Sequence, residues 1–181
     1  MERRRASGAC PASSGHLRRR RPPKRFYGGV DGHSQHHPAQ TYISVRPSRY
    51  SYELIGESGE FVINLTTSAL VRATDSCGVY TGRKVDKFKR FHLTPEPATE
   101  VRCPLLAESP LSLECRVFDR VPLGTHEMFL ADIVAVDVDE SLLDRDGKLC
   151  LERANLLAYA HGDYFALGRR LGSFGFSVKK R

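Results

Sequence analysis

Residues 111–138 read LSLECRVFDRVPLGTHEMFLADIVAVDV, and this stretch decides the fold. The segment 111–121 is a long β pattern in which apolar and polar residues alternate through 111–117, and apolar residues dominate 126–138. The connection at 122–124 contains Pro and Gly, which are typical turn residues. The pattern predicts a hairpin within a barrel. Because the second strand is apolar on both faces in places, we expect core on one side of it and a subunit contact on the other.

Two strand–helix units are predicted upstream of this hairpin. The β-rich segment 41–46 is stopped by Pro47, after which Ser48 is a good N-cap for a helix. The expected elements are a strand at 41–46, a helix from Ser48 to Gly59, a strand at 60–65, a helix from Ser68 to Gly78 and a short helix from about Val85. The chain is therefore expected to be mainly β, with flanking short helices.

Charge divides the chain at Thr41. Residues 1–40 hold nine Lys and Arg against two acidic residues, and so carry the whole formal net charge of +7. Residues 41–181 hold 19 basic and 19 acidic residues and are neutral. We therefore expect a basic leader at 1–40 and one folded domain at 41–181, long enough to bury a core. Any nucleic-acid binding would rest on the leader alone.

Neither a membrane span nor export is indicated by the sequence. The chain has no apolar run of about eighteen residues or more, and its Arg-rich start lacks the apolar stretch of a secretory signal. The expected compartment is the cytoplasm. Five scattered cysteines without a CxxC pair favour reduced thiols over a disulfide framework or a metal site.

Four polar residues, Arg46, Ser48, Arg49 and Ser51, surround the start of the first predicted helix. Free backbone N–H groups and the helix dipole favour a phosphate at such a position. The alternative is a capped helix with solvated arginines. The sequence contains no nucleophile elbow, zinc-protease motif, Walker loop or dinucleotide fingerprint, so cofactor binding by a β-rich scaffold is the better hypothesis.

Three further positions are candidate ligand contacts. Lys87 lies in GRKVDKF, where a lysine would reach an anionic ring edge or a phosphate; the alternative is a surface lysine. His126 follows the tight connection at 122–124, where side chains lie at a barrel rim, and is either a ligand contact or a structural residue. Tyr159 belongs to the aromatic cluster of AYAHGDYF, which would stack on a planar ligand or pack in the core.

Taken together, residues 41–178 resemble the flavin-reductase-like FMN-binding split-barrel proteins, in particular the flavoredoxin branch. Seven segments carry the resemblance: YISVRPSRYSYELI (42–55), GEFVINLTT (59–67), ATDSCG (73–78), GRKVDKF (82–88), THEMF (125–129), AYAHGDYFALG (158–168) and GSFGFSVKK (172–180). The resemblance implies a Greek-key split β-barrel with flanking short helices, a homodimer, and non-covalent FMN near the dimer interface.

The resemblance also implies roles for individual residues. Ser51 would hydrogen-bond the flavin from the first helix. Lys87 and His126 would face the N1, C2-carbonyl and N3 side of the ring, where negative charge accumulates on reduction. Tyr159 would pack against the ring. Cys77 lies in a family motif, and a packed small hydrophobe is favoured over a redox residue there.

The implied function is that of an FMN-dependent oxidoreductase of the flavin reductase type, which passes electrons from NADH, NADPH or a protein donor through bound FMN. The flavin supplies the chemistry, so no catalytic residue of the protein is expected. One alternative keeps the fold but makes the chain an electron carrier between redox protein partners, without its own NAD(P)H site. A third, less favoured, is nucleic-acid binding through the basic leader.

Residues 1–40 do not match the family pattern. Family members carry further barrel strands and a Trp-Thr-Gly segment that contacts FMN before the strand at 41–46, whereas this chain has no Trp. Codons for residues 9–40, read one nucleotide later, permit a family-like sequence that includes Val-Ala-Trp-Thr-Gly-Thr. We therefore interpret residues 1–40 as an aberrant leader, disordered or out of frame. We expect the chain as written to lack its N-terminal strands.

Overall fold

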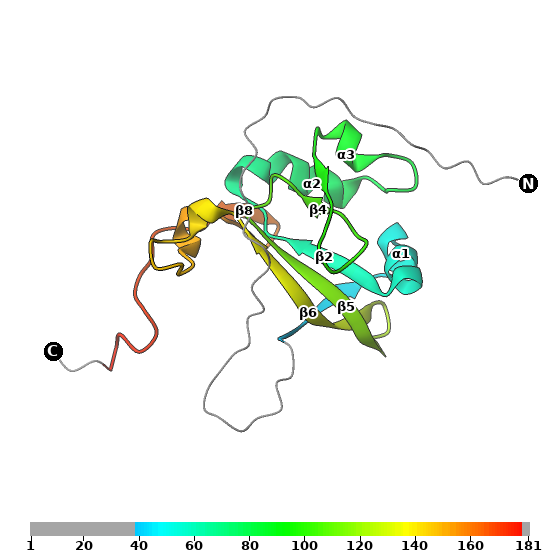
Figure 1. The fold of residues 1–181 in the computed structure, drawn as a ribbon. Coiled ribbons are helices and arrows are strands. Elements are labelled where there is room, and N and C mark those ends of the chain that lie inside the picture. Colours follow the sequence, from blue (N-terminus) through cyan, green and yellow to red (C-terminus); the bar gives the residue numbers. More distant parts are fainter. Residues whose placement is uncertain (1–38, 179–181) are drawn as a thin grey trace, which may run out of the picture.

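A four-stranded antiparallel sheet in the order β1-β6-β5-β2 forms the centre of the molecule (Figure 1). The computed structural model describes residues 39–178. Their elements are, in chain order, β1 (Gln40–Val45), α1 (Tyr50–Ser58), β2 (Glu60–Asn64), η1 (Ser68–Leu70), α2 (Val71–Val79), α3 (Lys87–Arg90), β3 (Pro95–Glu96), β4 (Leu105–Leu106), β5 (Leu111–Pro122), β6 (Glu127–Val138), η2 (Glu140–Leu142), η3 (Leu151–Arg153), β7 (Leu157–Ala160) and β8 (Asp163–Ala166). The prediction of a mainly β fold is confirmed.

The predicted hairpin is present as β5 and β6. The backbone N–H of Leu123 closes its turn by donating to the His126 carbonyl at 2.8 Å, and Gly124 adopts a φ of 75°, which glycine tolerates without steric cost. Register shifts after Glu114 and after Val117 mark β-bulges, which bend a strand and increase its twist. The sheet is therefore curled into a half-barrel. The strands that the resemblance places before β1, and the leader with its frame interpretation, fall on residues outside the described range.

The main core lies between one face of this sheet and α1. Phe129 and Ala131 of β6 and Cys115 of β5 are fully buried. Ile55 of α1 joins them in one apolar cluster, and the Tyr52 ring packs edge-to-face on Phe129 with 5.7 Å between ring centroids. The side chains that alternate inward along β5 and β6 thus hold α1, and α1 carries the first group of candidate site residues.

The first helix starts later than the sequence predicts. Arg49, not Ser48, occupies the N-cap position, and no side chain caps the helix. The Arg49 N–H donates to the Arg46 carbonyl at 2.9 Å, and this turn delays the helix, which begins at Tyr50. Gly59 ends the helix with a φ of 67°, as predicted.

The second predicted helix is divided into two parts. Residues Ser68–Leu70 form the 3₁₀ turn η1, and α2 follows directly. Gly78 lies inside α2 and does not end it, because the chain stays helical to Val79 and leaves the helix at Tyr80. The short third helix is confirmed as α3; its N-cap is Asp86, whose carboxylate accepts from the Lys89 N–H.

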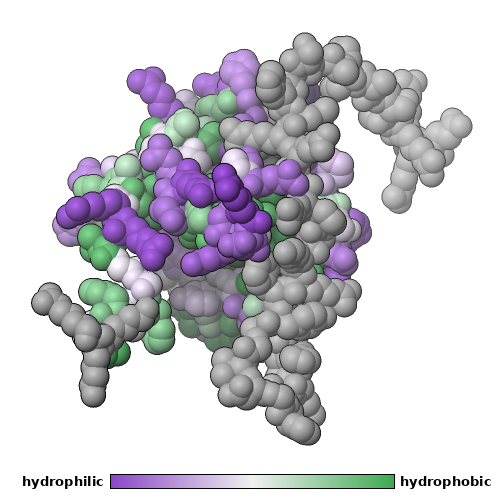
Figure 2. Space-filling model, turned by 60° about the vertical axis from the view of Figure 1, so that its left-hand side comes forward, coloured by the Kyte–Doolittle hydropathy of each residue, from purple (hydrophilic) through white to green (hydrophobic). Residues whose placement is uncertain are grey.

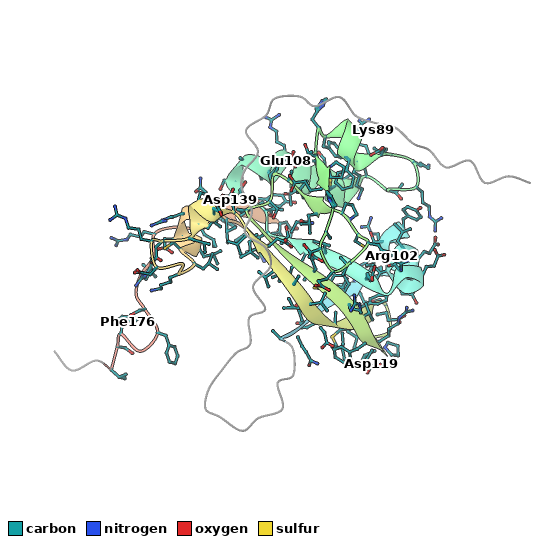
Figure 3. All side chains as sticks on the ribbon, viewed as in Figure 1. Lys89, Arg102, Glu108, Asp119, Asp139 and Phe176 are labelled. Carbon is teal, nitrogen blue, oxygen red and sulfur yellow. The ribbon has the colours of Figure 1, made fainter. Side chains whose placement is uncertain are left out.

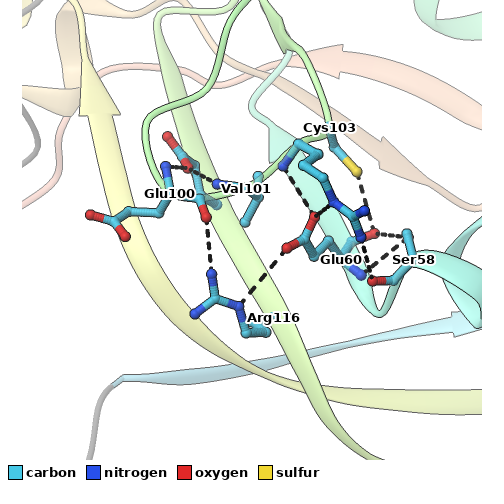
Figure 4. A network of polar contacts seen from close by, with 8 residues as sticks. Ser58, Glu60, Glu100, Val101, Cys103 and Arg116 are labelled. Carbon is cyan, nitrogen blue, oxygen red and sulfur yellow. Dashed lines mark hydrogen bonds and ion pairs between the residues drawn. The ribbon is translucent and has the colours of Figure 1, made fainter.

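A buried carboxylate holds the loop at 97–103 against β5. Glu114 is fully buried, and its two oxygens accept the backbone N–H groups of Thr99 at 2.8 Å, Glu100 at 2.7 Å and Val101 at 3.0 Å. These are charge-assisted bonds, which are shorter and stronger than neutral ones. Figure 4 shows this loop clamped beside the long strand β5.

A second acidic residue fixes the neighbouring end of the loop. The Glu60 carboxylate on β2 accepts the Arg102 backbone N–H at 3.1 Å and its Nε at 3.3 Å, with the Arg116 Nε 4.0 Å away (Figure 4). The hydrogen bond from the Arg102 backbone is the main cause that lowers the pKa of Glu60 below its ordinary value of 4.5.

The C-terminal part of the described chain forms a separate two-stranded sheet, β7–β8, which the sequence did not predict. Its turn is His161–Gly162, with φ values of 53° and 95°. A small apolar cluster of Leu142, Ala154 and Leu156 lies next to it in the chain. Residues 167–178 then run away from the body of the molecule (Figure 1), and the Phe176 side chain, labelled in Figure 3, lies on this outlying segment.

Two further features bear on the sequence predictions. No helix within residues 39–178 is long and apolar enough to cross a membrane. Cys77, Cys103, Cys115 and Cys150 are free thiols.

Candidate functional site

Arg46 and His126 form the pair at the centre of the candidate site. Arg46 directly follows β1 and His126 directly precedes β6, and the pairing of Val45 with Glu127 brings the two side chains together. The Arg46 Nε donates to His126 Nε2 at 3.3 Å. His126 Nδ1 lies 2.9 Å from the Thr125 hydroxyl, so both ring nitrogens have a polar neighbour. The pair therefore places an imidazole beside a guanidinium.

The start of α1 lies shortly after Arg46 in the chain. Ser48, Arg49 and Ser51 are exposed, as is Arg46. No side chain caps α1, although the Tyr52 N–H donates to the Arg49 carbonyl at 3.0 Å. The positive end of the helix dipole at this exposed start favours an anion. Two guanidinium groups, two hydroxyls and a helix N-terminus make a donor set suited to phosphate. The sequence predicted such a phosphate site, with a capped helix and solvated arginines as the alternative.

The GRKVDKF segment packs against the outer side of α1. A Cβ on Gly82 would lie 3.1 Å from Cδ1 of Tyr50, so glycine allows the close approach. The Arg83 guanidinium lies 4.9 Å from the Tyr50 ring centroid and forms an ion pair with Glu53. The segment that carries Lys87 is thereby held next to the helix that carries Ser51.

Lys87 itself is engaged with α2. Its Nζ donates to the Cys77 carbonyl at 2.6 Å, which places its positive charge at the C-terminal end of the helix, where the dipole favours a cation. Burial raises the pKa of the Cys77 thiol, and nearby Lys87 only partly opposes this. A raised thiol pKa means little thiolate at neutral pH, which favours the packing interpretation of Cys77 over a redox role.

Tyr159 lies on the β7–β8 hairpin and belongs to a different local cluster. Its side chain is 66% exposed and its ring packs on Tyr164, with 5.0 Å between centroids. The Tyr164 hydroxyl donates to the Asp75 carboxylate of α2 at 3.2 Å. Within residues 39–178 no hydrogen bond or ion pair joins Tyr159 or Lys87 to the pair of Arg46 and His126. The structure thus places the predicted residues in two groups. One lies at the start of α1 and includes the pair of Arg46 and His126, and the other consists of Lys87 and Tyr159, which contact α2 directly or through Tyr164.

A polar cluster that the sequence did not predict links α1 to strands β5 and β6 next to the site. The Tyr52 hydroxyl donates to the Glu127 carboxylate at 2.6 Å, and this bond raises the pKa of Tyr52. The Arg120 Nη2 donates to the Gly56 carbonyl at 2.7 Å, with the guanidinium 5.1 Å from the Phe129 ring centroid. Glu127 adjoins His126, so these bonds fix the rim of β6 against α1. Only the adjacency of Glu127 to His126 signals this in the sequence.

A shallow cavity of about 500 Å³ lies elsewhere. It is lined by Leu143, Asp144, Arg145, Asp146 and Arg153. None of the predicted site residues borders it. Asp144 is occupied there by its own loop, since its carboxylate accepts the backbone N–H groups of Asp146 and Lys148. We therefore place the candidate site at the β1–α1 junction and the β6 rim.

Comparison with known proteins identifies the fold. Among solved structures, the flavoredoxin of Desulfovibrio vulgaris (Miyazaki F) superposes with a TM-score of 0.73 at 32% identity, covering 78% of this chain and 77% of that chain. A flavoredoxin from Methanosarcina acetivorans gives 0.67 at 31% identity, with the same coverage. A protein of Archaeoglobus fulgidus is 33% identical over 106 residues, 59% of this chain and 59% of the relative, so the match spans less than two thirds of that relative's length.

The family model described as Flavin reductase like domain matches residues 33–168, which is more than half of the chain. The match begins a few residues before Thr41. Both the family resemblance and the split-barrel fold expected from the sequence are confirmed. The chain belongs to the flavin reductase like domain family, in its flavoredoxin branch.

Proposed function

We propose that this chain is an FMN-binding oxidoreductase that passes electrons from NADH, NADPH or a protein donor through bound FMN, and that it acts as a homodimer in the cytoplasm. The observation that carries the proposal is the donor set at the uncapped start of α1, next to the pair of Arg46 and His126. The similarity to two flavoredoxins, each above 30% identity, supports a flavin as the ligand.

The residues at the start of α1 fit the phosphate of FMN in charge and in hydrogen-bond donors. Arg46, Ser48, Arg49 and Ser51 would hold the phosphate and the adjoining polar groups, because they supply charged and neutral donors at the exposed start of α1. His126 Nε2 accepts a hydrogen bond from Arg46, so the imidazole orients the guanidinium. An anionic group of the ligand at this rim would contact that guanidinium.

Lys87 and Tyr159 would take the ring side of the same ligand. Lys87 uses one of its three donors on the Cys77 carbonyl and keeps the others for a carbonyl or ring nitrogen. Tyr159 offers an exposed aromatic face for packing. Bound FMN supplies hydride and electron transfer, and the protein residues position it and balance the negative charge of its reduced form.

The first test is a flavin titration of four proteins. They are the chain as written, a frame-restored chain in which the codons of residues 9–40 are read one nucleotide later, the frame-restored R46A/R49A variant and a matched frame-restored R145A control. We expect weak binding and poor solubility for the chain as written, and a yellow, stable dimer after frame restoration. Each lost arginine should weaken FMN binding about tenfold, since a hydrogen bond to a charged group contributes roughly 1.5–3 kcal/mol. R145A should bind normally.

The outcomes separate the two ideas in this proposal. Equal, stoichiometric FMN in the chain as written and the frame-restored chain would contradict the interpretation of residues 1–40. Absence of FMN binding in both would contradict the proposed function itself. Unchanged affinity in R46A/R49A would move the phosphate site away from the start of α1.

The similarity to flavoredoxins favours a second candidate, an electron carrier between redox protein partners without its own NAD(P)H site. Steady-state oxidation of NADH and NADPH by the FMN-loaded protein distinguishes the two. Turnover with either nucleotide supports the reductase, whereas no turnover, together with reversible photoreduction of the bound flavin, supports the carrier.

A further inference from the structure

We propose that residues 167–178 form an arm that docks on a second copy of this chain. The inference rests on the homodimer of the proposed function and adds to it the segment that makes the contact. Five apolar side chains along this segment are exposed: Leu167 by 55%, Leu171 by 85%, Phe174 completely, Phe176 by 62% and Val178 by 82%. Figure 2 shows apolar side chains in green where the segment runs toward the C-terminal end.

Such exposure is unusual for a segment that contains five large apolar side chains. Isolated exposed apolar residues are normal, but a contiguous row of large ones indicates a surface that is covered in the working assembly. The row does not fold back on its own molecule: Figures 1 and 3 show it leading away from the central sheet. Its first residue is held by the rest of the chain, since the Leu167 N–H donates to the Leu156 carbonyl at 2.9 Å. Further along, the Phe176 N–H donates locally to the Ser173 carbonyl at 3.0 Å.

The charge of the segment is opposite in sign to that of residues 41–166 of the same chain. Residues 41–166 hold 14 basic and 19 acidic side chains, a formal net charge of −5. Residues 167–181 hold five basic and no acidic side chains. The arm is therefore apolar and basic, and the body is acidic. An acidic body attracts this basic arm, so the opposite charges of residues 41–166 and 167–181 favour a second copy as the partner. An anionic lipid surface is the competing partner, and the vesicle measurement below separates the two.

The outer face of the sheet offers a matching acceptor. Side chains of Phe129 and Ala131 point into the core, so Leu130 points to the opposite face, where it is paired with Tyr42 of β1 and Asp119 of β5. Tyr42 is 62% exposed. Asp132, two residues along β6, lies on this same face. Arg116, the cross-strand partner of Asp132, also lies on this face, but its guanidinium is engaged with the Glu100 carbonyl and the Glu60 carboxylate. The apolar side chains and the Asp119 and Asp132 carboxylates of this face suit an apolar, basic arm.

Basic residues at the root of the arm provide the sharpest test. We would measure the dimer dissociation constant by sedimentation velocity for the full chain and its frame-restored form, each with R169E/R170E, with D119K/D132K, and with all four changes together. Either charge reversal should weaken the dimer at least tenfold. The four changes together restore opposite signs and should recover most of the affinity.

Apolar contacts are tested separately. F174S/F176S should also weaken the dimer at least tenfold, while L151S, an exposed leucine of η3, should leave it unchanged. Far-ultraviolet circular dichroism should be unaltered in every variant, because all these side chains lie outside the core. Sedimentation with phosphatidylserine vesicles is the remaining measurement, and no binding is expected.

Each result bears on the arm or on the flavin site, but not on both. Unchanged dimer affinity in F174S/F176S, or failure of the four-residue combination to recover affinity, would overturn the arm. So would vesicle binding that F174S/F176S abolishes while the dimer persists. A chain that binds FMN as a monomer overturns the arm and the homodimer, and leaves the proposed FMN binding standing. An arm-dependent dimer without FMN does the reverse.

Discussion

The two hairpins of this molecule, β5–β6 and β7–β8, differ in how they are held. β5 and β6 are long strands whose inward side chains, such as Phe129 and Cys115, are fully buried beneath α1. β7 and β8 are strands of four residues whose Tyr159 and Phe165 are more than half exposed. The first hairpin stabilises the fold, and we expect the second to open at lower cost in free energy, as regions that meet ligands and partners do.

The largest expected effect is on the long hairpin. Phe129→Ala removes a fully buried ring that contacts Tyr52 and leaves a cavity at the centre of the main core. The free energy of unfolding should fall by about 3–5 kcal/mol. Urea denaturation followed by circular dichroism measures it. Phe165→Ala, on β8, is the matched control and should cost less than about 1 kcal/mol. Equal losses would abolish the contrast between the hairpins.

The next effect concerns the clamp on β5. Glu114→Ala leaves three backbone N–H groups, those of Thr99, Glu100 and Val101, without their acceptor. We expect a loss of about 2–4 kcal/mol, because buried donors that lose a charged partner bear the full desolvation penalty. Hydrogen exchange should accelerate most at these three amides. Exchange that accelerates uniformly along the chain instead would show that the clamp does not act on this loop.

A pH dependence follows from Glu60. Its pKa is lowered in the folded chain, so it contributes stability that is fully present above its unfolded pKa of about 4.5 and is lost as the pH falls through the folded value. Glu60→Gln should remove about 1 kcal/mol near pH 7 and less at pH 3. Denaturation midpoints at several pH values measure this. A pH profile parallel to that of the unaltered chain would contradict the role of Glu60.

Sequence patterns predicted the parts of the molecule that local rules determine. Alternation over 111–117 and the Pro-Leu-Gly connection predicted the β5–β6 hairpin, and Gly59 predicted the end of α1. Residue order alone did not indicate that a turn at Arg46 moves the helix start to Tyr50. Contacts between distant segments were also beyond reach, since nothing local links Glu114 to residues 99–101.

The candidate site shows the same division. The sequence placed Arg46 and His126 as separate candidates, and only the pairing of β1 with β6 makes them one pair. Lys87 was expected to face a ligand, but its contact with the Cys77 carbonyl depends on how α3 meets α2. The β7–β8 hairpin was missed because its strands are short, although the His161–Gly162 turn was a local signal. The position of each site residue relative to bound FMN stays a prediction.

The smallest effect is expected on the short hairpin. Tyr164→Phe removes the hydroxyl that donates to Asp75 of α2 but keeps the ring that packs on Tyr159. Because this hydrogen bond is close to solvent, the free energy of unfolding should change by no more than about 0.5 kcal/mol. Amide exchange within residues 157–166 should nevertheless accelerate severalfold, while that of β5 and β6 stays the same. A change in global stability as large as that of Glu60→Gln would mean that β7–β8 unfolds together with the central sheet, and the two hairpins would then form one cooperative unit.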